Sequence, residues 1–204
     1  MRANLTVACL VLACMAGSAL AQTAPSGAGR MLLEEGRRLA ADGRTLDAAL
    51  VFQRIVAQSS DDDAGVREAQ YDMGVALFEL GLHAAAYGFF DRIAEIGSSH
   101  PKYYHILPWL VRIHDRIPGE TSSLARMSMF PPNQYPPEVA NDINLHVGQY
   151  HFDAGNLAAA LDSLSRVTTQ SPGLHVKAQY LKGVVEVRKN DPAAAAETFQ
   201  GILR

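Results

Sequence analysis

The chain has 204 residues, of which 48% are hydrophobic and 19% are charged, and its formal net charge is −3. This composition is typical of a globular protein and allows one domain or a short array of repeats. Because no cluster of Lys and Arg stands out, nucleic acid and an anionic membrane surface are not expected as partners.

The first residues have the pattern of a secretory signal peptide. Arg2 supplies a positive start, and an uncharged, mostly apolar stretch then covers residues 5–20. That stretch is short for a membrane span, which needs about 20 apolar residues, and Ala19–Ala21 fits the small-x-small cleavage rule. We therefore expect residues 1–21 to be a signal peptide that is cleaved after Ala21, and the mature protein to be periplasmic or secreted.

Both cysteines, Cys9 and Cys14, lie inside this segment. Without it the mature chain has no thiol, and therefore no disulfide and no cysteine-based metal site or nucleophile. An alternative is that "VLAC", which ends at Cys14, is a lipobox, although Leu12 is large for its position. The protein would then be an outer-membrane lipoprotein, and we expect membrane contact only in that case.

Helices are predicted after a short linker. Residues 22–30 are small, polar and rich in residues that break regular structure, so a flexible linker is expected there. From Met31 onward, apolar residues recur at spacings of three and four, and β-branched runs are short. This periodicity favours helices over strands.

A pattern of four residues recurs in phase along the helical region. A glycine is followed seven residues later by Gly or Asn, five later by Ala, and four later by an aromatic residue or Leu. The four sets are Gly36, Gly43, Ala48 and Phe52; Gly74, Gly81, Ala86 and Phe90; Gly148, Gly155, Ala160 and Leu164; and Gly183, Asn190, Ala195 and Phe199. Such self-similarity indicates a repeat architecture.

Each position in the pattern has a physical reason. The first glycine lets two helices cross closely, because a side chain there would hold them apart. The second Gly or Asn suits the left-handed conformation that ends a helix. The Ala and the aromatic residue share one face of the next helix and pack back onto the first. Each unit is therefore expected to be a helical hairpin of about 34 residues.

The pattern resembles the tetratricopeptide repeat. The resemblance rests on "MGVAL" from Met73 with A-x-x-x-F ending at Phe90, and on "VGQYH" from Val147 with Pro172, which is expected to end that unit. The tryptophan expected early in the first helix is replaced by Leu32, Gln70, Asn144 and Gln179. The resemblance implies an all-α fold, a right-handed superhelix of antiparallel helix pairs, over residues 31–204.

The array is expected to contain one degenerate unit. Units are predicted at about 29–64, 67–100, 101–140, 141–174 and 176–204, the third degenerate and the last incomplete. The third is expected to hold a helix interrupted near Pro108 and a short helix in "TSSLARMSMF", whereas "FPPNQYPP" (130–137) cannot be regular helix. That Pro-rich segment is predicted to be a connector that fills a packing gap, or else a recognition segment in polyproline conformation. Because no polar capping element precedes Arg204, we expect either a fragment of a longer protein or an end that meets a partner.

No catalytic or metal-binding constellation is found, and no cofactor is expected. His100 and His105 are five residues apart, as are His146 and His151, whereas metal ligands on one helix face are three or four apart. We expect partly exposed or helix-terminal histidines. The run of aspartates at 61–63 lacks the alternating ligands of a calcium loop and is expected to be a solvated loop.

The resemblance implies that the first helix of each unit lines a concave surface. The implied groove positions are Leu33, Arg37, Ala40, Glu68, Tyr71, Val75, Phe78, Asp142, Leu145, Gln149, Phe152, Lys177, Tyr180, Val184 and Arg188. This mixture of aromatic, aliphatic and Arg side chains suits a peptide or a helix as the ligand. The alternative left open is that Tyr71, Phe78 and Phe152 pack between neighbouring repeats.

The function expected from these features is a non-enzymatic protein-interaction scaffold of the bacterial cell envelope, which binds a protein or peptide partner in its groove. The stretches "YYHILPWLVRI" (103–113) and "KAQYLKGVVEVRKNDPAAAAETF" (177–199) are similar to envelope tetratricopeptide proteins of myxobacteria and their relatives, some of which are linked to gliding motility. Two alternatives remain open. One is a structural component that assembles through its ends, with or without an anchor at Cys14, and the other is the targeting part of a longer enzyme.

Overall fold

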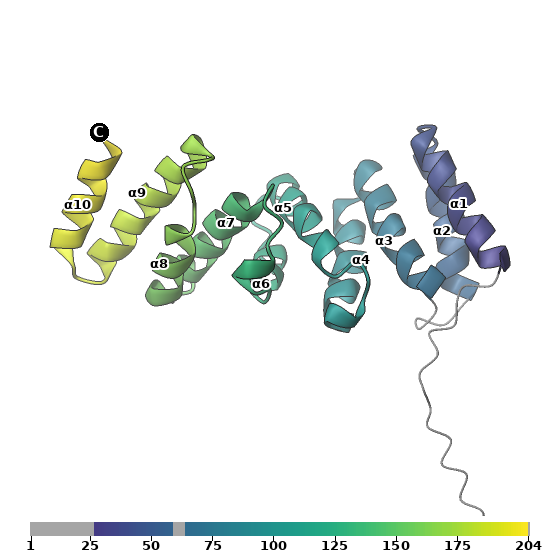
Figure 1. Ribbon diagram of the computed structural model, residues 1–204, viewed down its shortest axis with the longest axis horizontal. Coiled ribbons are helices and arrows are strands. Elements are labelled where there is room, and N and C mark those ends of the chain that lie inside the picture. Colours follow the sequence, from purple (N-terminus) through teal and green to yellow (C-terminus); the bar gives the residue numbers. More distant parts are fainter. Residues whose placement is uncertain (1–26, 59–63, 204) are drawn as a thin grey trace, which may run out of the picture.

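The computed structural model describes residues 27–58 and 64–203, so the predicted signal peptide, the run of aspartates at 61–63 and Arg204 lie outside it. The described chain is all helical, in agreement with the predicted fold class. Its α-helices are α1 (Gly27–Ala41), α2 (Thr45–Gln58), α3 (Ala64–Glu79), α4 (His83–Ile96), α5 (Leu107–Arg116), α6 (Ser122–Met127), α7 (Ala140–Asp153), α8 (Leu157–Ser165), α9 (Pro172–Arg188) and α10 (Pro192–Ile202). Successive helices pair as antiparallel hairpins, which line up in one elongated array from α1 at one end to α10 at the other (Figure 1).

Helix α1 begins earlier than predicted. It starts at Gly27, so residues 27–30, for which the sequence predicts a linker, are helical. A glycine weakens a helix by only about 1 kcal/mol. Leu33 and Leu39 are both buried on α1, and burying each leucine contributes about 1.5–3 kcal/mol. The packing of this apolar stripe therefore outweighs the glycines that precede it.

The helix-ending positions of the repeat adopt the predicted left-handed backbone. The φ angle is 77° at Gly43, 79° at Gly81 and Gly155, and 62° at Asn190. At the first of these turns, the Gly43 N–H donates to the Ala40 carbonyl (3.1 Å), and the next N–H along the chain donates to the Leu39 carbonyl (2.9 Å). This is the Schellman arrangement, and the same pair of hydrogen bonds recurs at the other three turns.

The leading glycine of each unit makes room for the aromatic residue or leucine of the same unit. A Cβ atom built on Gly74 would lie 2.7 Å from the ring of Phe90, and one built on Gly148 would lie 2.7 Å from the side chain of Leu164. The prediction of a close helix crossing is therefore confirmed. The structure adds that the side chain from the second helix, rather than its backbone, fills the space above the glycine.

The helices of the degenerate unit are short, with 10 residues in α5 and 6 in α6. A 3-10 turn, η2 (Tyr104–Ile106), leads directly into α5, so Pro108 lies in the first turn of that helix and does not interrupt it. Proline is well tolerated there because the N–H it lacks would have had no partner within the helix. Pro172 likewise begins α9, so the expectation that this proline ends a unit was wrong.

The Pro-rich segment packs as a connector. It forms one 3-10 turn, η3 (Pro132–Gln134), between extended residues. Phe130 and Tyr135 are buried in the core, and the Phe130 ring stacks on Tyr103 with 4.5 Å between ring centroids. These contacts favour the first of the two predicted roles, a segment that fills a packing gap.

The hydrophobic core consists of two clusters that meet at α7. The larger cluster extends from α1 to Ile143 and Val147 of α7. The smaller one begins at Leu145 of the same helix and continues through α8 to Val185 of α9. Helix α7 therefore contributes side chains to both clusters, and it separates the array into two packed parts.

Candidate partner-binding groove

Ion pairs connect α1 and α3 on the N-terminal part of the inner surface. The Arg37 guanidinium lies 2.6 Å from a carboxylate oxygen of Glu68 and 2.6 Å from one of Asp72, and Lys102 Nζ lies 3.2 Å from Glu68. Partial burial alone would raise the pKa of Glu68, but the hydrogen bonds from Arg37 and Lys102 outweigh it and lower that pKa. Burial raises the pKa of Asp72, and the bond from Arg37 opposes this only in part. Two predicted groove residues, Arg37 and Glu68, thus already have partners within the chain.

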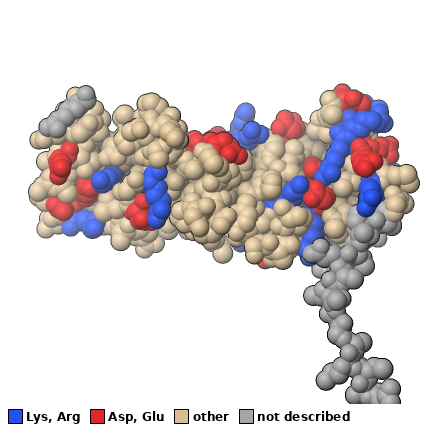
Figure 2. Space-filling view, viewed as in Figure 1, with Lys and Arg blue, Asp and Glu red and all other residues tan. Residues whose placement is uncertain are grey.

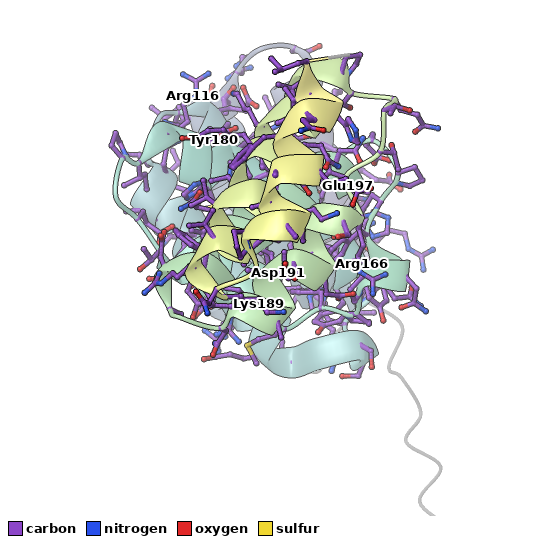
Figure 3. All side chains as sticks on the ribbon, turned by 90° about the vertical axis from the view of Figure 1, so that its left-hand side faces the viewer. Arg116, Arg166, Tyr180, Lys189, Asp191 and Glu197 are labelled. Carbon is purple, nitrogen blue, oxygen red and sulfur yellow. The ribbon has the colours of Figure 1, made fainter. Side chains whose placement is uncertain are left out.

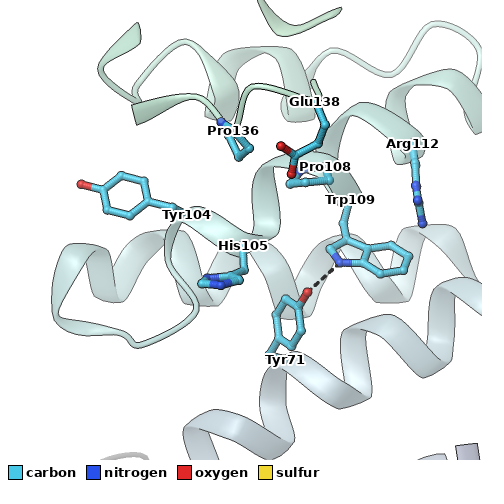
Figure 4. A pocket seen from close by; sticks show the side chains of 8 residues that line it. All are labelled: Tyr71, Tyr104, His105, Pro108, Trp109, Arg112, Pro136 and Glu138. Atoms are coloured by element: carbon cyan, nitrogen blue, oxygen red, sulfur yellow. Dashed lines mark hydrogen bonds between the residues drawn. The ribbon is translucent and has the colours of Figure 1, made fainter. Parts of the chain in front are cut away.

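The side chains of Tyr71 and Phe78 pack against Trp109 of the degenerate unit. The Trp109 indole N–H donates to the Tyr71 hydroxyl at 2.9 Å (Figure 4). Phe78 is buried and meets the Trp109 ring edge-on, with 5.3 Å between centroids. The alternative left open for these two residues was packing between neighbouring repeats. Phe78 is buried in such a contact, whereas Tyr71 makes the contact and is only partly buried.

A hollow of about 350 Å³, here called the aromatic hollow, opens beside this contact. Its walls come from α3, from the degenerate unit and from the connector, and are formed by Tyr71, Tyr104, His105, Pro108, Trp109, Arg112, Pro136 and Glu138 (Figure 4). The Arg112 guanidinium lies 4.6 Å from the centre of the Trp109 ring. Of these residues the sequence predicted only Tyr71, because the others lie outside the recurring pattern. The signal that could have found them is the chain's one tryptophan inside an aromatic run.

A smaller hollow of about 260 Å³ lies between α1, the start of α2 and α3. Ala40 and Val75, both predicted groove positions, line it together with Arg37 and Asp72. Leu33, by contrast, is buried in the core.

An apolar hollow of about 540 Å³ lies between α7 and α9, with Ile202 of α10 at its edge. This α7–α9 hollow is lined by Leu145, His146, Gln149, Val176, Lys177, Tyr180, Leu181 and Ile202. Four predicted groove residues, Leu145, Gln149, Lys177 and Tyr180, are brought together here. Tyr180 is 58% exposed and Val176 is 49% exposed, and Tyr180 lies on the opposite side of α10 from Glu197 (Figure 3).

The remaining predicted positions lie farther along α7 and α9. The Arg188 guanidinium lies 5.1 Å from the centre of the Phe152 ring and donates to the Phe152 carbonyl at 3.3 Å. Both Phe152 and Val184 are half-buried, as is Asp142 near the start of α7. Arg188 thus covers part of the Phe152 ring, which reduces what that ring can offer a partner.

The histidines have environments that the sequence did not reveal. His100 is only 2% exposed, and its Nδ1 accepts the Lys102 backbone N–H at 3.0 Å. It is therefore not partly exposed, but it does end a helix, because it is the C-cap of the 3-10 turn η1 (Gly97–Ser99). Burial lowers the pKa of His100 to about 4. The rings of His114 and His146 meet edge-on with 4.7 Å between centroids, and His146 lies 3.6 Å from Asp115. In the described ranges, no group of three or more His, Cys, Asp or Glu side chains is placed to hold a metal ion.

Two surface properties concern the class of partner. On the face shown in Figure 2, basic and acidic side chains are interspersed and form no extended patch of one sign. Across residues 27–58 and 64–203, no helix is long and apolar enough to cross a membrane.

Comparisons with known proteins agree with this architecture. The family model described as "Tetratricopeptide repeat" matches residues 33–101 and 141–204, and the unmatched interval holds the degenerate unit and the connector. No curated protein sequence matches the chain significantly.

Two similar solved structures carry the name MamA. "MamA RS-1 ArsTM double mutant" has a TM-score of 0.56 at 17% identity, and "MamA 41-end from Desulfovibrio magneticus RS-1" has a TM-score of 0.53 at 18% identity. Each alignment covers 87% of this chain and 94% of the other. At these identities the likeness shows the fold alone. The repeats and the fold together support a protein-interaction scaffold, and the chain belongs to the tetratricopeptide repeat family.

Proposed function

We propose that this protein is a non-enzymatic scaffold of the bacterial cell envelope that binds a segment of a partner protein in the α7–α9 hollow. The observation that carries the proposal is the exposure of Tyr180 and Val176 beside buried Leu145, in a hollow whose lining is mostly apolar. Tyrosine is among the residues that contribute most to the binding energy of protein interfaces, and concave, mostly apolar surfaces are the usual binding sites.

The distribution of contacts along the inner surface favours the C-terminal part as the binding site. Arg37, Glu68 and Phe78 have their partners within the chain, so an incoming segment would have to displace those contacts. Tyr180 has a ring contact of its own, with 6.0 Å between the centroids of its ring and that of Phe199, but the residue remains 58% exposed and can be reached without displacing that contact. The aromatic hollow, next along the array, is a second surface that the same partner could reach.

The envelope location rests on the signal-peptide features of residues 1–21. Mass measurement of the protein from its host tests it directly. We expect a mature chain that begins at Gln22, which would also exclude a lipidated Cys14. Retention of residues 1–21 in the mature protein would overturn this part of the proposal, and a mass that fits a lipid on Cys14 would replace it with the lipoprotein alternative.

In-cell photocrosslinking tests the binding site. A photoreactive residue at position 180 is expected to give a discrete adduct with one protein, which mass spectrometry identifies. The matched control is a probe at Gln53, an exposed position on α2, in the second helix of its hairpin. Adducts of equal intensity from both positions, or no adduct at position 180 from a chain with a native circular dichroism spectrum, would reject the α7–α9 hollow as the binding site. Binding through the ends of the array, the structural alternative, would then be tested with probes there.

A further inference from the structure

The lining of the α7–α9 hollow carries an unbalanced charge. Among its eight lining residues, Lys177 bears the one permanent charge, and no carboxylate is present. The side chain of Lys177 is exposed and forms no ion pair with any residue that the structure describes. A cation is thus held at the edge of an apolar surface in a chain whose net charge is −3.

The neighbouring cations of α9 have partners. Lys182 Nζ lies 3.9 Å from a carboxylate oxygen of Glu186, and Arg188 is engaged by the ring and the carbonyl of Phe152. Lys177 differs from both residues because the hollow that it lines contains no carboxylate to pair with its ammonium group.

We propose that the partner segment carries an Asp or Glu next to two apolar side chains. The apolar side chains pack on Leu145, Val176 and Tyr180, and the carboxylate pairs with Lys177. This inference rests on the proposed function and specifies its ligand.

Complementary charge at the edge of an apolar contact acts mainly on specificity and on the association rate. Lys177 is exposed, so its pair with a carboxylate is worth less than a buried pair. We expect the apolar contacts to determine whether a segment binds. Lys177 is expected to determine which of several apolar segments is preferred.

Selection from a random library of displayed peptides tests the inference, because the library offers the hollow segments of every charge and polarity. The wild-type protein and Lys177→Glu are each used to select binders, with Lys189→Glu as the control. Lys189 is an exposed lysine at the end of the same helix, outside the hollow. A third variant, Val176→Glu, tests whether the peptides bind in the hollow, since Val176 is 49% exposed and can be replaced without disturbing the core.

We expect peptides selected by the wild type to bind Lys177→Glu about tenfold more weakly, because the charge reversal turns a modest attraction into a repulsion. Lys189→Glu should bind them as the wild type does. Peptides selected by Lys177→Glu should carry Lys or Arg where the first set carries Asp or Glu. If binding is lost in Val176→Glu but is the same in Lys177→Glu, the charge inference is wrong while the hollow remains the binding site. If no selected peptide depends on Val176, the proposed function itself fails.

Discussion

The ring of Phe90 occupies the space that a side chain at Gly74 would need. A Cβ atom at position 74 would lie 2.7 Å from the ring's Cε1, and Phe90 is completely buried there. Helices α3 and α4 are thereby locked together at one point of contact, and the same relationship holds in the other three units that carry the recurring pattern.

Replacing Gly74 by Ala should destabilise the array, although alanine is the better helix former. The added methyl group must displace a fully buried ring, and such overpacking costs about 1–3 kcal/mol of the free energy of unfolding. Urea denaturation followed by circular dichroism measures the loss.

The control for this substitution is Gly88→Ala on the partner helix α4. A Cβ atom at Gly88 meets nothing within 4 Å, so alanine should gain up to about 1 kcal/mol from helix propensity. Equal effects of the two substitutions would show that the contact between Gly74 and Phe90 does not limit the packing.

Tyr71→Phe should weaken the junction between α3 and α5. It removes the hydroxyl that accepts the Trp109 indole N–H at 2.9 Å, a bond whose net contribution is about 0.5–1.5 kcal/mol. Because Trp109 is the chain's one tryptophan, the change can be followed by its fluorescence during urea denaturation.

Tyr104→Phe is the matched control, since Tyr104 lines the same aromatic hollow and points away from Trp109 (Figure 4). We expect little change in the emission maximum or in stability. A shift as large as that of Tyr71→Phe would mean that the Tyr71 hydroxyl has no special role.

Arg37→Gln should lower stability by about 0.5–1 kcal/mol, a modest amount because the Arg37 side chain is 45% exposed and water screens its pairs with Glu68 and Asp72. High salt should reduce the difference from the wild type. In Arg38→Gln, the lost pair with Asp42 spans 3.6 Å between two exposed side chains, and no measurable change is expected. The interpretation fails if thermal denaturation finds the two variants equally stable.

His100 should make stability depend on pH. The pKa of His100 falls from the ordinary 6.5 to about 4 in the folded chain, so between these values the unfolded state binds more protons than the folded state. The free energy of unfolding contributed by neutral His100 is therefore full above pH 6.5 and is lost as the pH falls towards about 4.

The matched variant is His100→Asn, whose side-chain oxygen can accept the Lys102 N–H and does not titrate. Urea denaturation from pH 7 to 4 gives the free energy of unfolding of both proteins. Subtracting the variant's value from that of the wild type cancels the contribution of the carboxylates, which the two proteins share. This difference should shrink and then change sign as the pH falls. Two parallel pH curves would contradict the buried, neutral state of His100.

The fold could be predicted from the sequence because its main constraints are local. Gly43 and Asn190 end their helices through their own backbone preferences, and Gly74 and Phe90 meet within one hairpin. A pattern that repeats such local rules in phase leaves few alternatives. The repeat pattern is interrupted at Pro108 and Pro172. The sequence indicated a change in structure at both prolines, but not that each lies in the first turn of a helix.

The site was less predictable because its properties depend on contacts between units. Nothing near Arg37 in the sequence shows that Glu68 and Asp72 will neutralise it, and the resemblance gave no role to Trp109. Lys177 and Tyr180 were predicted as groove positions, but only the structure shows which of the predicted positions share a hollow and which are already occupied.

The meeting of the two hydrophobic clusters at α7 has a mechanical consequence. The buried side chains of the two clusters come together only at α7, so the array has two packed arms that share this helix, and we expect the array to bend most easily there. The aromatic hollow lies on one arm, and the α7–α9 hollow begins at α7 and extends along the other. A partner segment long enough to occupy both hollows would bridge the two arms, and we expect it to restrict bending at α7.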